Sequence, residues 1–196
     1  RYFCDMKLLV ESRLPSKWGE YVVAAYGEEG DRYPHVVLYS DLEQLKGGRV
    51  PLRIHSECMT GDVFASRRCD CGAQLVAALD HFKQHGGILI YLRQEGRGIG
   101  LVEKLRAYNL QDEGMDTFEA NVARGHAEDA REYDAAVAIL KQLGVESVGL
   151  LTNNPEKVKA LEIAGLEVDR IPVSVGAHQD NAAYLKAKAD ITGHWL

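Results

Sequence analysis

The chain contains 196 residues, of which 46% are hydrophobic and 27% are charged. These ordinary values exclude a disordered, collagen-like or low-complexity chain. Lys and Arg total 23 against 29 Asp and Glu, which leaves a net charge of −6. This acidic balance does not favour nucleic acid or an anionic membrane surface as a partner, and no apolar stretch approaches the ~20 residues of a membrane-spanning helix.

The first quarter of the chain is predicted to form strands, because Val, Ile, Leu and Tyr recur there between turn residues. The expected strands are residues 6–14, 19–26, 35–39 and 50–55. Later segments alternate between helical and strand patterns. The expected helices are residues 72–84, 99–110, 132–143, 155–164 and 182–192, with strands at residues 88–92, 148–152 and 166–175. This order predicts an α/β fold, namely a single domain over residues 1–196 with a mixed sheet, flanking helices and a β-rich N-terminal part.

Three cysteines, Cys58, Cys69 and Cys71, form the pattern C-x10-C-x-C. Thiolates suit zinc, and three protein ligands are typical of a catalytic site that leaves one position for water. A structural site would take a fourth ligand, which His55 could supply. The alternative is that the three are small buried hydrophobic residues, and it is less favoured because charged residues surround them.

The fourth cysteine, Cys4, lies outside this pattern. Four cysteines could form two disulfides, but a single residue separates Cys69 from Cys71, and the first ten residues do not resemble a signal peptide. A reduced, cytoplasmic setting is therefore expected, and in that setting such a cluster indicates metal.

Two further segments combine the end of a strand with the start of a helix. In residues 93–100, glycines let backbone N–H groups approach an anion and arginines can clamp phosphate, while the carboxylate of Glu95 suits the N1 and 2-amino edge of guanine. In residues 151–157, Asn154 is a predicted helix N-cap at a strand end where α/β sheets bind ligands. The alternatives are a charged surface turn for the first segment and plain helix capping for the second.

Five ordered sequence blocks include these features. They read R-I-H-S-E-C, C-D-C-G-x-Q, R-Q-E-G-R-G-I-G, D-T-x-E-A-N and T-N-N-P-x-K. With them the chain resembles GTP cyclohydrolase II, the first enzyme of riboflavin synthesis, from about residue 14 to the C-terminus. The resemblance implies that GTP is hydrolysed: the imidazole ring opens, C8 leaves as formate, pyrophosphate is cleaved, and a diaminopyrimidine ribosylamino 5′-phosphate remains. It also implies one zinc ion per chain, magnesium with the triphosphate, and a homodimer.

The resemblance assigns roles to residues by their match to the family motifs. The expected zinc ligands are Cys58, Cys69 and Cys71. The expected GTP-binding residues are Arg53, Ile54, His55, Ser56, Glu57, Gln74, Glu95, Gly96, Arg97, Thr117, Thr152 and Lys157. Asp129 matches the family's proton acceptor and Arg131 its proposed nucleophile. A guanidinium has a pKa above ~12 and a poor lone pair, so stabilising charge on the departing pyrophosphate is the easier role for Arg131.

Tyr108 is the remaining candidate catalytic residue. The helix at residues 99–110 has an expected apolar face of Leu101, Val102, Leu105 and Tyr108. A tyrosine can pack its ring in the core and still present its hydroxyl to a pocket.

Three alternative functions remain open from the sequence. One is a relative that acts on GTP and retains the formyl group. Another is a zinc nucleotide deaminase, because His55-Ser56-Glu57 matches the H-x-E of those enzymes, although their P-C-x-x-C is missing. The third is a non-catalytic nucleotide-binding or zinc-stabilised scaffold, which the complete cysteine pattern disfavours.

Overall fold

The computed structural model describes residues 6–115, 119, 120, 122, 124, 125, 131–173, 175, 176, 180–182, 185, 186, 189, 190 and 193–195. The chain divides into two compact units. Unit 1 consists of Arg1–His55, Val76–Arg93 and Tyr133–Val173, and unit 2 of Ser56–Leu75, Gln94–Glu132 and Ser174–Leu196. The single domain over residues 1–196 stays a prediction.

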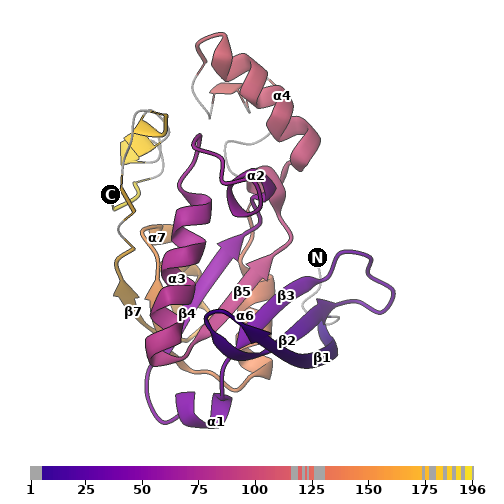
Figure 1. Cartoon of the computed structure of the whole chain (residues 1–196), viewed down its shortest axis with the longest axis vertical. Helices are drawn as coiled ribbons and strands as arrows, with labels where there is room; N and C mark the ends of the chain where they lie inside the picture. Colours follow the sequence, from indigo (N-terminus) through magenta and orange to yellow (C-terminus); the bar gives the residue numbers. More distant parts are fainter. Residues whose placement is uncertain are drawn as a thin grey trace. The chain divides into compact units, whose positions relative to one another are not determined.

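Unit 1 is built on a seven-stranded sheet with the strand order β1-β2-β3-β5-β4-β6-β7 (Figure 1). The strands are β1 Lys7–Ser16, β2 Gly19–Gly27, β3 His35–Tyr39, β4 Val50–Ser56, β5 Ile88–Leu92, β6 Ser147–Leu151 and β7 Glu167–Ile171. The pairs β1–β2, β2–β3 and β3–β5 are antiparallel, whereas β4–β6 and β6–β7 are parallel. The predicted mixed sheet in an α/β fold is therefore confirmed.

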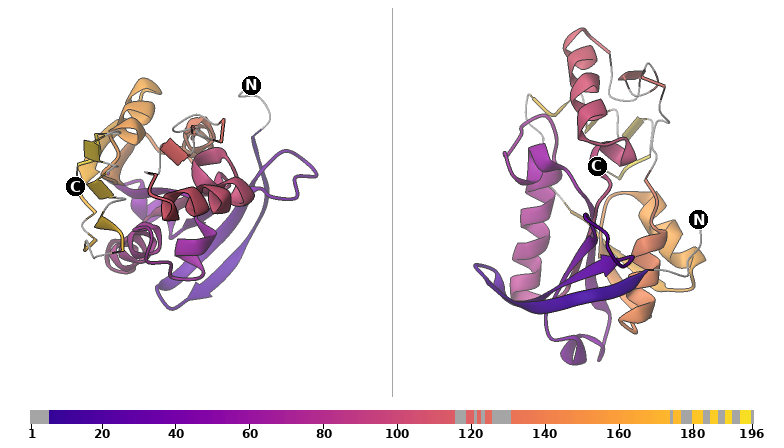
Figure 2. Two further views of the ribbon diagram at one scale, coloured as in Figure 1. Left: turned by 90° about the horizontal axis from the view of Figure 1, so that it is seen from above. Right: turned by 90° about the vertical axis from the view of Figure 1, so that its right-hand side faces the viewer.

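The helices of unit 1 cover both faces of this sheet. Figure 2 shows α3 (Cys71–His85) against one face and α6 (Asp134–Gln142) and α7 (Pro155–Ile163) against the other. A strand between two helical layers is buried on both sides, so its sequence is an apolar run rather than an alternating one. The core accordingly centres on fully buried residues of β4, β5, β6 and α6, namely Leu52, Ile54, Ile88, Ile90, Leu150, Ile139 and Leu140.

Most predicted elements agree with the structure to within two residues at each end. β7 is the exception, since it ends at Ile171 rather than near residue 175. Pro172 follows directly and has no N–H to donate to a ladder. The short helices α1 (Leu42–Leu45), α2 (Met59–Asp62) and η1 (Glu95–Gly98) were not predicted, because four residues are too few to show a period. The helix expected at residues 182–192 includes positions outside the described residues and stays a prediction.

Unit 2 contains α2, the start of α3, η1 and α4 (Leu101–Asp112). The predicted apolar face of α4 is wrong at two of its four residues, because Val102 and Leu105 are 62% and 45% exposed, whereas Leu101 and Tyr108 are partly buried. The buried residues of this helix are instead Lys104 and Ala107. The face that α4 buries meets polar groups of η1 and α2, and a lysine can cover such a surface with its aliphatic stem while its ammonium reaches partners.

Among the described residues, no helix combines the length and apolarity needed to cross a membrane.

Candidate metal centre and active site

The three predicted metal ligands come together in unit 2. Cys58 directly precedes α2, Cys71 is the first residue of α3, and Cys69 lies two residues before it. Their sulfur atoms all lie within 4.8 Å of one another, and the Sγ atoms of Cys58 and Cys69 are 3.7 Å apart. Cys58 and Cys69 are buried, and Cys71 is half-buried. Residues thirteen positions apart in sequence therefore form one compact group of thiols.

Two glycines make this close approach possible. A Cβ atom at Gly61 would lie 3.0 Å from the Sγ of Cys69 and 3.2 Å from the Sγ of Cys58. A Cβ atom at Gly72 would lie only 2.3 Å from the carbonyl oxygen of Gly61. The thiols thus pack against a backbone surface that any side chain would obstruct. Asp62 fixes the same turn, because its carboxylate accepts a hydrogen bond of 3.0 Å from the Cys58 N–H.

The spacing of the sulfur atoms fits a zinc ion. Two thiolates bound tetrahedrally to one zinc at ~2.3 Å lie ~3.8 Å apart, which agrees with the 3.7 Å between Cys58 and Cys69. Three soft donors also favour zinc over the hard cations magnesium and calcium. His55, the fourth ligand considered from the sequence, belongs to unit 1 and stacks there on Tyr91, with ring centroids 5.4 Å apart.

Charge is distributed unevenly over the three thiols. Hydrogen bonds from Cys69 and Cys71, together with the nearby Lys104 ammonium, hold the pKa of Cys58 far below its ordinary value. Hydrogen bonding to that thiolate and burial raise the pKa of Cys69 and of Cys71. Cys58 therefore loses its proton more readily than the other two thiols, and a metal ion that binds all three sulfur atoms must release the protons that remain.

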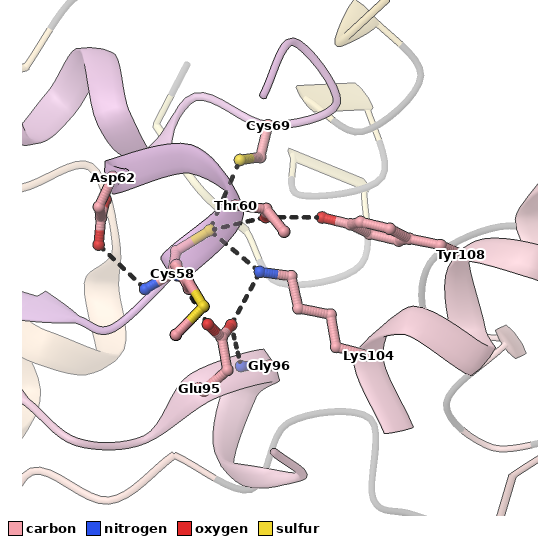
Figure 3. A network of polar contacts seen from close by, with 9 residues as sticks. Cys58, Thr60, Asp62, Cys69, Glu95, Gly96, Lys104 and Tyr108 are labelled. Atoms are coloured by element: carbon pink, nitrogen blue, oxygen red, sulfur yellow. Dashed lines mark hydrogen bonds and ion pairs between the residues drawn. The ribbon is translucent and has the colours of Figure 1, made fainter. Parts of the chain in front are cut away.

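Lys104 connects this cluster to Glu95 (Figure 3). Its Nζ lies 3.2 Å from the Sγ of Cys58 and 2.8 Å from Oε1 of Glu95. Burial alone would lower the pKa of Lys104, but the bond to Glu95 and the thiolate of Cys58 outweigh it and raise the pKa. The lysine is thus a permanent cation between the thiols and a carboxylate. It was missed from the sequence, although its position four residues before Tyr108 places both on one helix face.

Glu95 is held by backbone as well as by Lys104. Its Oε2 accepts a hydrogen bond of 2.6 Å from the Met59 N–H, and its Oε1 accepts one of 2.8 Å from the Gly96 N–H. Gly96 and Arg97 both have left-handed backbone, with φ of 63° and 60°. That conformation is strained for Arg97, so the loop holds an uncommon geometry beside the thiols.

Tyr108 projects from α4 toward the same cluster. Its hydroxyl lies 3.3 Å from Oγ1 of Thr60, and Thr60 Oγ1 lies 3.7 Å from the Sγ of Cys58. The guanidinium of Arg68 lies over the Tyr108 ring, 4.8 Å from its centroid. Burial raises the pKa of Tyr108 against the effect of the Thr60 bond, so the phenol keeps its proton at neutral pH and can donate it in a hydrogen bond.

These groups surround one pocket that lies wholly in unit 2. Besides the three thiols, the sequence-predicted residues that line it are Ser56, Glu57, Gly96, Arg97, Tyr108 and Arg131. Further lining residues, not expected from the sequence, are Arg68, Ile99, Lys104, Ala107 and Gln111. The pocket therefore combines apolar side chains with the cations Arg68, Arg97, Lys104 and Arg131 beside the three thiols, a lining that suits an anionic ligand.

Two other predicted residues of unit 2 hold polar neighbours. Ser56 Oγ accepts a hydrogen bond of 2.9 Å from Gln94, and Gln74 donates one of 2.6 Å to Asp70. Thr117 and Asp129 lie outside the described residues, so their predicted roles stay predictions.

The remaining predicted residues belong to unit 1, where they are buried at the ends of β4 and β6 and the start of α7. Arg53 donates a hydrogen bond of 2.9 Å to the Leu151 carbonyl, and Lys157 donates one of 2.7 Å to the Ile54 carbonyl. Thr152 Oγ1 accepts a bond of 3.0 Å from the Asn154 N–H.

The predicted N-cap of α7 is confirmed. The Asn154 side chain accepts a hydrogen bond of 2.9 Å from the Glu156 N–H, and Pro155 occupies the first turn. The neighbouring Asn153 bonds both backbone groups of Val173. The polar residues of this block therefore build the turn, which is compatible with a ligand at the strand ends and does not require one.

Comparison with known proteins identifies the family. The family model described as GTP cyclohydrolase II matches residues 7–172. The chain is 49% identical over 193 residues to a GTP cyclohydrolase-2 of Neisseria meningitidis serogroup A, covering 97% of each chain. It is 47% identical to a GTP cyclohydrolase-2 of Citrobacter koseri, covering 98% of each, and 47% identical to the riboflavin biosynthesis protein VVA0006 of Vibrio vulnificus, covering 52% of that protein.

Among solved structures, a two-domain 3,4-dihydroxy-2-butanone 4-phosphate synthase from A. baumannii matches with a TM-score of 0.47 and 18% identity. It covers 88% of this chain and 41% of that one, a similarity too low to inform on function. The sequence matches identify the family. The chain belongs to the GTP cyclohydrolase II family and is an enzyme, a hydrolase of riboflavin biosynthesis.

Gly61→Ala tests whether the close packing of the thiols matters for metal binding. The added methyl group would press on the sulfur atoms of Cys69 and Cys58, so zinc affinity should fall at least about tenfold, or ~1.4 kcal/mol of binding free energy. Competition with a chromophoric chelator measures this. Gly47→Ala is the control, because its Cβ would meet only the Gln44 carbonyl at 3.7 Å. Equal zinc affinity in both variants would contradict the assignment.

Proposed function

We propose that this chain catalyses the zinc-dependent ring opening of GTP, with release of formate and pyrophosphate and formation of a diaminopyrimidine ribosylamino 5′-phosphate. The observation that carries the proposal is the pocket in which three thiols, Tyr108 and Arg131 meet, in a chain of the GTP cyclohydrolase II family. The deaminase alternative loses support, because the family match covers most of the chain and includes the His55-Ser56-Glu57 block.

Cys58, Cys69 and Cys71 would hold one zinc ion per chain. A zinc ion with three protein ligands polarises carbonyl groups and activates water at neutral pH. The chain's own contribution is to keep the three thiols within 4.8 Å of one another, with Cys58 and Cys69 buried and Cys71 half-buried.

Glu95 and the η1 backbone would position the guanine. The Glu95 carboxylate accepts three hydrogen bonds from the protein and has about four acceptor positions in all. It can therefore receive about one donor from the 2-amino or N1 edge of guanine. Gly96 has no side chain, so the base could approach the backbone there. A Cβ at this position would also meet Lys104 at 3.1 Å.

The cationic side of the pocket would bind the triphosphate together with magnesium. Arg97, Arg68 and Arg131 line the pocket, and a guanidinium matches two phosphate oxygens at once. Arg131 would stabilise the charge on the departing pyrophosphate, because a group that stays protonated is a poor nucleophile. Water would then attack the α-phosphorus as pyrophosphate leaves, and Asp129 would accept the proton that this water gives up.

The other parts of the proposal rest on the family resemblance. They are GTP contacts from Arg53, Ile54, His55, Ser56, Glu57, Gln74, Thr117, Thr152 and Lys157, a homodimeric assembly, and a cytoplasmic location.

Cys69→Ser tests the proposed chemistry at the ring. A serine hydroxyl is a weak zinc ligand at neutral pH because it keeps its proton, so the variant should lose both zinc and formate release. Pyrophosphate cleavage should survive in part, since it depends on Arg131. Metal analysis and quantification of formate and pyrophosphate after incubation with GTP measure the three quantities. Full formate release from zinc-free protein would contradict the proposal.

Tyr108→Phe separates full formate release from the alternative in which the formyl group is retained. Ring opening would first give a formamide, and the phenolic O–H of Tyr108, which lines the pocket, would hold the formamide carbonyl there for the second hydrolysis. Loss of one such bond costs about 1–3 kcal/mol, or roughly ten- to hundredfold in rate.

The Tyr108→Phe variant should therefore stay folded, consume GTP and accumulate the formylated intermediate, which mass spectrometry of the products detects. Tyr33→Phe is the control, because that ring is exposed. A Tyr108→Phe enzyme that yields deformylated product at the wild-type rate would reduce Tyr108 to a packing residue.

A further inference from the structure

Lys104 is a buried charged side chain of unit 2 whose position none of the roles above explains. Its residue is 9% exposed, and a buried ammonium is costly unless it is paired and hydrogen-bonded. Its two partners are Cys58 at 3.2 Å and Glu95 at 2.8 Å. One partner is the sulfur of a proposed metal ligand, and the other is the carboxylate that would bind the base. The lysine therefore lies between the group that would hold the metal and the group that would hold the substrate (Figure 3).

A nearby cation would offset the excess negative charge of the metal-bound thiolates. Three thiolates exceed the charge of a divalent ion by one negative charge, and Glu95 adds another nearby. A hydrogen bond from an ammonium withdraws electron density from the sulfur that accepts it, and this leaves the bound metal a stronger Lewis acid. A purely structural lysine would need only the carboxylate as its partner.

The position of Glu95 depends on the same contact. Lys104 and the Gly96 N–H share Oε1, and the Met59 N–H holds Oε2. Met59 follows Cys58 directly in the chain, so the carboxylate and the thiolate are fixed to each other both through the backbone and through Lys104. A shift of Lys104 would move both groups.

We propose that Lys104 is a positioning residue that tunes the metal centre by donating a hydrogen bond to the Cys58 thiolate while it holds Glu95 toward the base. This inference deepens the proposed function and rests on its zinc site. Substrate contact is not part of the role, which acts through Cys58 and Glu95.

The test uses the purified protein loaded with Co(II), whose thiolate-to-cobalt charge-transfer band reports the electron density on sulfur. Lys104→Met keeps the aliphatic stem and removes the ammonium, so the band should move to longer wavelength. Zinc affinity measured by chelator competition, or activity, should fall about 10- to 100-fold. Arg106→Met is the matched control, because Arg106 is an exposed cation on the same helix that pairs with Glu103 at 2.5 Å.

Glu95→Gln provides a second, independent variant. It weakens the competing partner, so Lys104 should bond more strongly to Cys58 and the cobalt band should move to shorter wavelength. If Lys104→Met fails to fold, this spectrum decides, and an unchanged band overturns the inference.

The remaining outcomes separate the two proposals. A Lys104→Met band identical to that of wild type, with a full equivalent of Co(II) bound, overturns the role of Lys104 alone. Wild-type protein that binds no Co(II) overturns the proposed metal site and this inference with it. If Lys104 had only a structural role, its replacement by methionine would lower the stability of the protein without moving the cobalt band.

Discussion

Three sulfur atoms held within 4.8 Å of one another are the constraint on which unit 2 depends. As metal ligands all three would be thiolates, and thiolates so close and so buried repel one another because little water screens their charge. The absence of a side chain at Gly61 leaves room for the sulfur atoms, and the buried ammonium of Lys104 offsets their negative charge. The surrounding loops are shaped accordingly: α2 begins at the residue after Cys58, α3 begins at Cys71, and α4 turns Lys104 inward.

The polar network reaches from the three thiols that would hold the metal to the residues that would recognise the base. Lys104 bonds Glu95, and Glu95 orders η1 through the Gly96 N–H and α2 through the Met59 N–H. On the other side of the thiols, Thr60 joins Cys58 to the Tyr108 hydroxyl. Polar groups in a buried network polarise one another. A substitution at one member should therefore alter the proposed metal site, the proposed base-binding site and the Tyr108 hydroxyl together.

Much of the fold could be predicted because local pattern and tertiary burial agree in unit 1. The inner strands β5 and β6 are largely apolar runs, and α6 has an apolar face that includes Ala136, Ile139 and Leu140. In α4 the two disagree, since Val102 and Leu105 face solvent and Lys104 is buried. Hydrophobic periodicity cannot identify a buried face whose partner is polar. The cysteines could be found because their spacing forms a motif. Lys104 belongs to no such motif, and hydrophobic periodicity does not reveal a buried lysine.

The measurement that tests the central claim most directly is X-ray absorption at the zinc K-edge of the protein purified with its metal. A single zinc held by Cys58, Cys69 and Cys71 predicts three sulfur neighbours at ~2.3 Å and one lighter atom in the remaining position. A shell with fewer than three sulfur atoms, or one dominated by nitrogen and oxygen, would contradict the assignment of these thiols as the metal centre.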